Sequence, residues 1–325
     1  MAAPARWTAL FAVALSTLLP ASAAVAAQGY PNRPIRIVVA FPPASSNDML
    51  ARFVGGKLGE RFGQQVVVDN RAGANGIIGT ELAARATPDG HTLLVVSMSH
   101  TMNAAVYKLP FDPVNSFTAV SMIGSGPNML AAHPSFAANT VKELIALAKA
   151  KPGQIAYASS GTGGINHFGG ELLARTAGIQ LVHVPYKGGG PALIDVMGGH
   201  VPLIVCTVPL CLPPVKTGKI KALGVGGAKR SVLLPEVPTI AESGAPGYEF
   251  TVWWGILAPA GTPAAIVNQL NAEIGAILAQ PESAQKLASE GAEPKIVSPS
   301  EFSRIIAADT ERWIGIARKA NIKAE

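Results

Sequence analysis

The stretch from residue 35 to residue 58 constrains the fold of this chain more than any other. It opens with a nearly continuous apolar run bounded by prolines, which is typical of a buried strand in a parallel sheet. A polar loop, residues 42–48, follows, and in it Ser46 or Asn47 is predicted to cap a helix whose positive end suits Asp48. The pattern predicts a loop at the carboxyl edge of a sheet, where α/β proteins bind ligands, although an ordinary βα turn has the same pattern.

Short strands alternate with helical segments along the rest of the chain, which predicts a parallel α/β sheet with helices on its faces. Two capping boxes, one from Thr140 to Glu143 and one from Ser298 to Glu301, mark helix starts. The predicted strands are residues 35–41, 65–69, 92–96, 120–123, 154–158, 180–184, 201–206, 221–225 and 253–258.

Two of these strands, near residues 121–127 and 252–259, are predicted to cross between two lobes. Lobe 1 is expected to contain both chain ends, residues 28–124 and 251–325, with the terminal helix packed on it. Lobe 2 is expected to be the inserted segment 125–250. A ligand cleft then lies between the lobes, because few covalent links join them.

The first 27 residues have the pattern of a secretory signal peptide. Arg6 supplies a positive start, residues 8–19 a short apolar core, and residues 24–27 the small side chains of a cleavage site. No later run approaches the roughly 18 to 20 apolar residues that a transmembrane helix needs. We therefore expect a soluble protein exported to the periplasm.

The composition argues for a large apolar core and against a nucleic-acid partner. Apolar residues make up 49% of the chain and charged residues 14%, so disorder is not expected. The formal net charge of +6 is spread along the chain without a basic run or an aromatic ladder. Such a charge mildly favours anionic ligands and says little about nucleic acid.

The two cysteines, Cys206 and Cys211, lie in an apolar segment. In an oxidising compartment they are close enough in sequence for a small-loop disulfide, and the apolar setting suits two buried thiols equally well. Neither has a Cys or His neighbour at ligand spacing, so no metal site is expected. The sequence does not decide between a disulfide and two buried thiols.

The chain contains none of the common catalytic signatures: no G-x-S-x-G elbow, no H-E-x-x-H and no Walker A loop. The six histidines are scattered, and His167 is the most suggestive because it opens a helix beside a loop of Ser, Thr and Gly. Gly161 and Gly163 follow a strand, but Asn166 stands where a dinucleotide fingerprint has its third glycine. We therefore predict no catalytic residues and no cofactor.

Four polar loops share a feature that is typical of anion-binding sites. Residues 42–48, 70–76, 159–167 and 185–191 are rich in Gly, Ser, Thr and Asn and lead directly into helix starts. Such loops expose backbone N–H groups toward the positive end of a helix, and hydroxyls add donors. They suit a carboxylate or a similar anion, while the alternative is that these small residues only satisfy tight turns.

A set of motifs in chain order resembles the Bug family, the extracytoplasmic substrate-binding proteins related to the tripartite tricarboxylate transporters. The motifs are residues 30–35, 42–52, 70–76, 157–167, 183–188 and 234–244. The resemblance implies an α/β, type II periplasmic-binding-protein fold: two lobes joined by two crossing strands, closing on a small carboxylated ligand. It implies no catalysis.

The resemblance also implies which residues face the ligand. Where the family's first loop usually has two glycines, this chain has Ala44 and Ser45, so the choice of ligand transfers least. Asp48 is expected either to accept a hydrogen bond from the ligand or to cap the helix. The predicted ligand-binding residues are Ala44, Ser45, Ser46, Asn47, Asp48, Asn75, Ser97, Ser99, Ser160, Gly161, Thr162, Gly163, Asn166, His167 and Thr207.

The predicted function is therefore capture of an organic mono-, di- or tricarboxylate, aromatic ones included, by a monomeric protein. The expected partners are the membrane subunits of a tripartite tricarboxylate transporter. Two alternatives stay open: a subunit that presents its ligand to a membrane histidine kinase, and an exported α/β enzyme that acts on a carboxylate.

Overall fold

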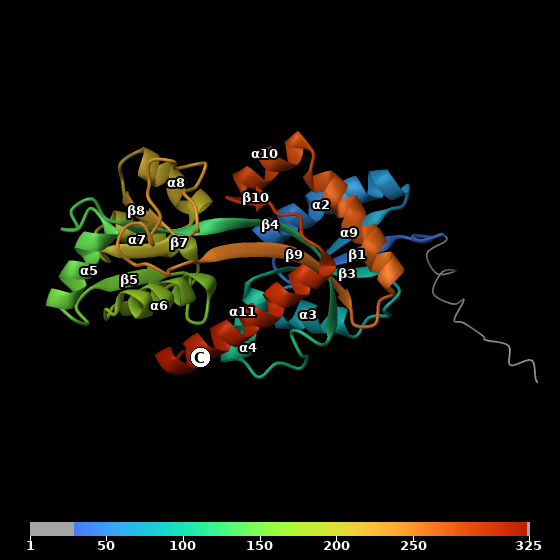
Figure 1. Ribbon diagram of the computed structural model, residues 1–325, viewed down its shortest axis with the longest axis horizontal. Helices are drawn as coiled ribbons and strands as arrows, with labels where there is room; N and C mark the ends of the chain where they lie inside the picture. Colours follow the sequence, from blue (N-terminus) through green and yellow to red (C-terminus); the bar gives the residue numbers. More distant parts are fainter. Residues whose placement is uncertain (1–28, 324–325) are drawn as a thin grey trace, which may run out of the picture.

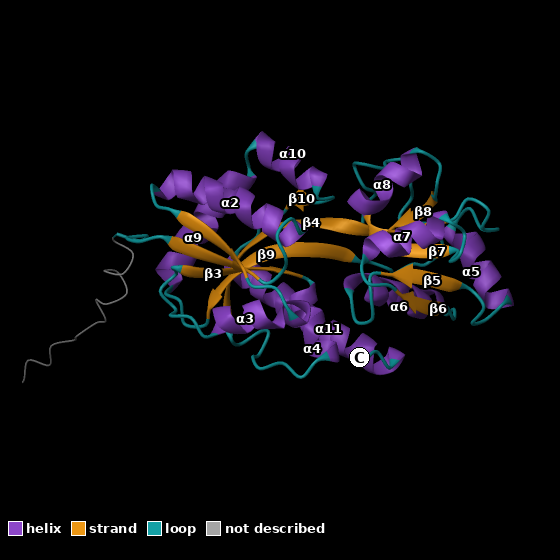
Figure 2. Ribbon diagram, turned by 180° about the vertical axis from the view of Figure 1, so that it is seen from behind, coloured by secondary structure: helices purple, strands orange, loops and turns teal. Residues whose placement is uncertain are grey.

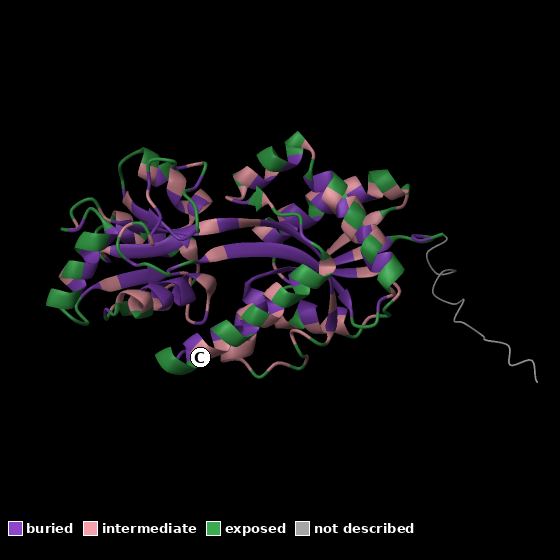
Figure 3. Ribbon diagram, in the orientation of Figure 1, coloured by how far each residue is buried: buried purple, intermediate pink, exposed green. Residues whose placement is uncertain are grey.

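The computed structural model describes residues 29–323 and has two lobes joined by two long strands (Figure 1). The predicted signal peptide, residues 1–27, lies outside the described residues. Within the described range, no helix combines the length and the apolar character needed to cross a bilayer. The central strands of both lobes are largely buried, and the exposed residues lie mostly on the outer faces of the helices and in the loops (Figure 3).

The first lobe is built on a sheet in which β1 (Ile35–Val39) pairs in parallel with β2 (Val66–Asn70) and β3 (Thr92–Ser97). β9 (Thr251–Pro259) extends this sheet antiparallel to β3. Ile35 and Ile37 of β1 are fully buried, as the apolar run predicts.

Helices cover both faces of this sheet (Figure 2). On one face lie α2 (Ser46–Phe62), α9 (Ala264–Leu278) and α10 (Pro281–Ser289). On the other lie α3 (Ile77–Ala84), α4 (Ser99–Val106) and α11 (Pro299–Ala320), and a short 3-10 turn, η1 (Ala74–Gly76), precedes α3. The two-residue strand β10 (Glu293–Pro294) pairs with β4.

The second lobe repeats the βα arrangement. β5 (Ala156–Ser159) lies between β6 (Val182–Pro185) and β7 (Leu203–Thr207) and is parallel to both. β8 (Lys221–Val225) pairs with the far end of β4. The helices of this lobe are α5 (Val141–Ala150), α6 (Ile165–Ala177), α7 (Gly189–Met197) and α8 (Val208–Lys216).

The crossing strand β4 (Phe117–Ala132) is much longer than the predicted segment 120–123. Its first part pairs antiparallel with β9, and its last residues pair with β7 and β8, so one continuous strand belongs to both sheets. The full length of β4 was not predicted, because Gly124, Gly126 and Pro127 interrupt the apolar pattern. The predicted return crossing corresponds to β9.

Both predicted capping boxes are present. Thr140 Oγ1 accepts a hydrogen bond from the N–H of Glu143, and Ser298 Oγ accepts one from the N–H of Glu301. The helix that Ser298 caps, α11, packs on α4 and β4, as expected of a helix on the first lobe. It also reaches the second lobe, because the Trp313 ring lies 5.6 Å from the Phe168 ring of α6. The helix thus packs on lobe 1, as predicted, and also contacts lobe 2.

Candidate ligand cleft

A cleft of about 450 Å³ lies between the lobes. Its walls come from the starts of α2, α4 and α6, from η1 and from the end of β7, so both lobes contribute. None of the lining residues carries a formal charge. They are Phe41, Ser45, Ser46, Asn47, Asn75, Ser97, Ser99, Tyr107, Ser160, Gly161, Thr162, Gly164, Ile165, Asn166 and Thr207.

The structure brings most of the predicted ligand-binding residues to this one cleft. Eleven of the fifteen line it, and the four that do not are Ala44, Asp48, Gly163 and His167. The lining residues outside the predicted set are Phe41, Tyr107, Gly164 and Ile165. That the eleven predicted residues contact a ligand stays a prediction.

The start of α2 is capped by Ser45, and the prediction of Ser46 or Asn47 as the cap was wrong. Ser45 Oγ accepts from the N–H of Asp48 at 3.3 Å and donates to the Pro42 carbonyl at 2.8 Å. The cap falls one residue earlier because Ser45 has the extended backbone that a capping residue needs. The Ser45 hydroxyl is therefore committed to its own loop, although the residue lines the cleft.

The first loop turns through Ala44, which adopts a left-handed backbone with φ of 64°. This conformation is easy for glycine and costs a residue with a Cβ on the order of 1 kcal/mol. The Ala44 N–H donates to the Asp48 carboxylate at 2.9 Å, and the Ser45 N–H donates to the Pro42 carbonyl at 3.3 Å. Within the described chain, the N–H groups of Ser46 and Asn47 have no protein acceptor, so they are the donors that α2 leaves free.

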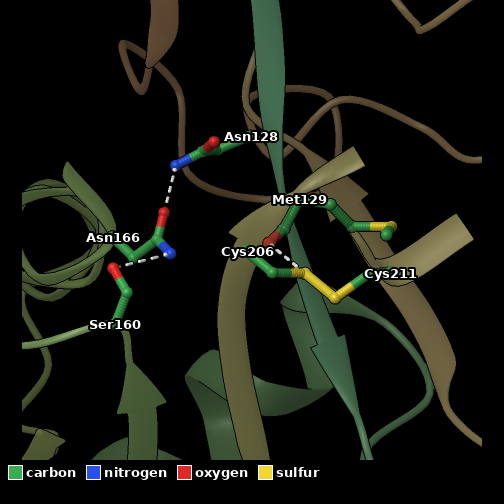
Figure 4. The surroundings of a disulfide bond; sticks show 6 residues. All are labelled: Asn128, Met129, Ser160, Asn166, Cys206 and Cys211. Carbon is green, nitrogen blue, oxygen red and sulfur yellow. Dashed lines mark hydrogen bonds between the residues drawn. A yellow bond between two sulfur atoms is a disulfide. The ribbon is translucent and has the colours of Figure 1, made fainter. Parts of the chain in front are cut away.

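The start of α6 is organised differently. Its capping residue is Gly164, which has no side chain to offer, and no other side chain of the described residues accepts from the first N–H groups of this helix. The Thr162 hydroxyl likewise has no hydrogen-bond partner among the described residues. Ser160 Oγ accepts from the Asn166 amide at 3.3 Å, and Asn166 accepts from the Asn128 amide at 3.1 Å (Figure 4).

The two lobes approach each other closely at the edge of the cleft. A Cβ built on Gly163 would lie 3.3 Å from Val106 Cγ2 at the end of α4. The loop before α6 therefore rests on the first lobe next to the lining residue Tyr107. Gly163 also has φ of 70°, which favours glycine.

Two further pairs of polar side chains lie in the wall of the first lobe. Ser97 Oγ and Ser99 Oγ are 2.9 Å apart and buried. The Asn75 amide donates to Asn103 Oδ1 at 2.7 Å, and Asn103 donates back to the Asn75 carbonyl. The side chains of residues 29–323 form no cluster of His, Cys, Asp and Glu that could hold a metal ion.

A model of the family described as the tripartite tricarboxylate transporter family receptor, TctC, matches residues 50–322. This chain belongs to that family. BugT from Bordetella pertussis is 36% identical to this TctC-family receptor over 305 residues, which are 93% of this chain and 94% of BugT.

Two solved structures are similar to this receptor over nearly its whole length. R. palustris Rpa4515 with adipate has a TM-score of 0.78 and 36% identity, covering 91% of this chain and 100% of that one. The periplasmic binding protein BugD has a TM-score of 0.74 and 33% identity, with coverages of 91% and 100%. The receptor therefore has the predicted two-lobed fold of a periplasmic solute-binding protein.

Asp48 of the receptor faces the protein rather than the cleft. It is almost fully buried and accepts from the Ala44 N–H, Asn70 Nδ2 and Arg52 Nε at 2.9 to 3.0 Å. Burial by itself raises the pKa of Asp48, but these hydrogen bonds and the Arg52 charge outweigh it and lower the pKa below its ordinary value. Asp48 thus holds the first loop against α2 and β2.

His167 of the receptor also lies behind the cleft wall. Its Nδ1 accepts from the Gly163 N–H at 3.0 Å, and its ring stacks on His183 with 3.7 Å between the ring centroids. Burial, with a smaller contribution from His183, lowers the pKa of His167 to about 3. Burial lowers the pKa of His183 to about 4. Both imidazoles are neutral at pH 7 and brace the loop before α6.

Cys206 and Cys211 are joined by a disulfide, which decides the alternative that the sequence left open. The bridge connects the end of β7 to the first turn of α8 and lies close to the chain of amides that begins at Asn128 (Figure 4). It flanks Thr207, a cleft-lining residue whose hydroxyl forms no hydrogen bond with the other described residues. The bridge thereby restrains one wall of the cleft.

Phe41 and Tyr107 were missed for different reasons. Phe41 ends the predicted strand 35–41, so its hydrophobicity was attributed to that strand. In the structure β1 already ends at Val39, and Phe41 belongs to the loop after it, a standard ligand position of parallel sheets. Tyr107 follows the short helix α4, and nothing in the local sequence indicates that the helix ends beside the opposite lobe. The aromatic rings give the cleft an apolar surface beside its donors.

Proposed function

We propose that this receptor captures a small organic carboxylate outside the cytoplasm and delivers it to the membrane subunits of a tripartite tricarboxylate-type transporter. One observation supports this most: the starts of α2 and α6 contribute to the same uncharged cleft and leave N–H groups without acceptors among residues 29–323. The binding of adipate by the relative Rpa4515 supports the same class of ligand.

The physical basis is the orientation of these donors. Unpaired N–H groups at a helix start and the dipole of the helix favour a negative charge there. Because no lining side chain is charged, hydrogen bonds from N–H groups and hydroxyls, rather than an arginine, stabilise the bound carboxylate. Arg71, the one arginine in the four predicted loops, pairs with Asp69 at 3.0 Å.

Three further proposals follow the same line. Residues 1–27 act as a cleaved signal peptide, which places the mature receptor in the periplasm. Lobe 1 consists of residues 28–124 and 251–325, and lobe 2 of residues 125–250. The lobes close on the ligand by bending of β4 and β9, the two strands that join them.

The first experiment identifies the ligand class. Purified mature protein is screened by thermal shift against mono-, di- and tricarboxylates, because a ligand at about 100 times its dissociation constant adds roughly 2.7 kcal/mol to the native state. At least one acid is expected to raise the melting temperature, and it should be recovered unchanged, as a receptor requires. A panel in which no acid binds would contradict the proposal.

The second experiment tests how the acid is held. Replacing Ser160 and Thr162 by Ala is expected to weaken binding about tenfold to a hundredfold, because a hydrogen bond to a charged group is worth roughly 1.5 to 3 kcal/mol. Arg71→Ala is the comparison variant and should leave the affinity intact. Intact affinity in the double variant, with binding lost in Arg71→Ala, would replace the helix-start mechanism by a cationic clamp.

Closure is tested by small-angle scattering with and without the identified acid. Saturation is first established by calorimetry. The radius of gyration should fall on binding, and an unchanged radius at saturation would contradict closure.

A further inference from the structure

One side chain in the cleft wall has an unsatisfied polar group. In the described part of the chain, five buried side-chain N and O atoms have no hydrogen-bond partner, and Asn47 Nδ2 is the one that belongs to a cleft-lining residue. Asn47 is the second residue of α2 and is 5% exposed. A native protein seldom leaves such a buried donor unpaired, because the loss of its hydrogen bonds to water is not compensated.

The other amides of the cleft are already engaged. The Asn75 amide donates to Asn103, and the Asn166 amide donates to Ser160. Within the described chain, the Asn47 side chain forms no hydrogen bond at either end, so a half-turn of its amide exchanges the N and O positions without breaking a protein contact. The amide is therefore free to turn its NH₂ group toward a ligand in the cleft.

The surroundings of Asn47 favour an anionic oxygen as the acceptor. Its own N–H and that of Ser46 are unpaired at the positive end of the α2 dipole. The neighbouring acid, Asp48, is directed away from the cleft into its contacts with Ala44, Asn70 and Arg52. A carboxylate oxygen beside Asn47 would thus meet donors and no competing charge.

We propose that Asn47 is a specificity-determining residue: its amide donates to a carboxylate oxygen of the ligand on the wall of the first lobe. This assignment rests on the proposed function and adds to the backbone donors a side chain that selects an acceptor. The ligand then has an oxygen acceptor at the α2 end and a second group that meets Thr162 and the start of α6.

The test compares Asn47→Leu with Asn75→Leu, two substitutions of similar size in one cleft. Calorimetry uses the tightest-binding acid of a C3 to C8 dicarboxylate panel, with adipate as the reference probe. Asn47→Leu is expected to lower affinity about tenfold, the loss of roughly 1.4 kcal/mol, without lowering the melting temperature of the ligand-free protein. Asn75→Leu is expected to lower that melting temperature, because it removes the donor to Asn103 Oδ1.

A third variant, Asn47→Asp, places an anionic oxygen where the amide nitrogen was and should weaken the same acid more than Asn47→Leu does. If the wild type binds an acid and Asn47→Leu binds it equally well, the assignment to Asn47 is overturned while the proposed function stands. A lowered melting temperature with unchanged affinity would make Asn47 a structural residue. A wild type that binds no acid at all removes the proposed function and this assignment together.

Discussion

The starts of α2 and α6 each follow a parallel strand, one in each lobe, and both line the cleft. They differ in how the N–H groups of the first helical turn are paired. At α2 the chain uses its own side chains: Ser45 caps the helix, and Asp48 holds the preceding loop. At α6 the capping residue is Gly164, so within the described chain the first N–H groups have no side-chain acceptor, and His167 holds the loop by accepting from the Gly163 N–H. Both loops contribute to the cleft, but the α6 loop keeps more of its donors available.

This difference separates stability from binding within one site. A hydroxyl that caps its own helix stabilises the fold and has little left to offer a ligand, whereas an unpaired hydroxyl contributes to binding alone. Ser45 and Thr162 line the same cleft and look alike in sequence, yet they represent these two cases. Four predictions test the distinction, in order of the expected effect.

Asp48→Ala should have the largest effect, a loss of about 2 to 3 kcal/mol of unfolding free energy, because a buried carboxylate with several hydrogen bonds disappears and its donors stay buried. Since the pKa of Asp48 is lowered in the folded state, its contribution is present above its ordinary value and is lost as the pH falls through the lowered one. Urea unfolding at pH 7 and pH 3 measures both. A variant with the wild-type midpoint at pH 7 would show that the loop does not depend on Asp48.

Replacing both Cys206 and Cys211 by Ala should cost about 2 kcal/mol, the value expected for so short a loop. Binding should also weaken, because Thr207 loses its restraint next to the bridge. Thiol titration of the denatured, unreduced wild type comes first and should find no free thiol. Two free thiols would refute the bridge.

The histidine stack should make stability fall with acid by on the order of 1 to 2 kcal/mol between pH 7 and pH 5. The pKa of both His167 and His183 is lowered by burial, so the unfolded chain takes up protons below about pH 6.5 that the folded chain refuses. His183→Gln, which can keep a hydrogen bond to Ser159, should reduce this pH dependence. His200→Gln, which removes an exposed imidazole, is the control, and equal slopes in all three proteins would argue against the stack as the cause.

The smallest effect is the paired comparison of Ser45→Ala and Thr162→Val. Ser45→Ala should cost about 1 kcal/mol of stability through loss of the cap, with little change in affinity. Thr162→Val should leave the melting temperature nearly unchanged and lower the affinity about tenfold, because it removes one ligand hydrogen bond. Calorimetry and thermal unfolding of both variants decide the point. The opposite pattern would mean that the α2 loop, not the α6 loop, supplies the binding hydroxyl.

Much of the fold followed from local patterns. The apolar run before residue 42 is a buried strand, the boxes at Thr140 and Ser298 cap helices, and the family resemblance is confirmed by the TctC model. These features depend on neighbours in sequence, through propensity, periodicity and hydrogen bonds over three or four residues. The length of β4 was not predicted, because its pairing with β9, β7 and β8 outweighs the glycines and the proline within it.

For the cleft, the sequence by itself determined the kind of donor: loops of Ser, Thr, Asn and Gly that lead into helix starts. The structure added that no charged residue lines the wall, because it leaves the predicted wall residue Asp48 out of the lining. It did not determine which donors are free. Ser45, Ser46 and Asn47 are all competent caps, and the backbone angles at one position chose Ser45. The tertiary structure turned Asp48 toward Asn70 and His167 toward His183, away from the cleft, and placed Tyr107 beside the opposite lobe. These partners lie on other strands and loops, so no local pattern of the sequence records the outcome.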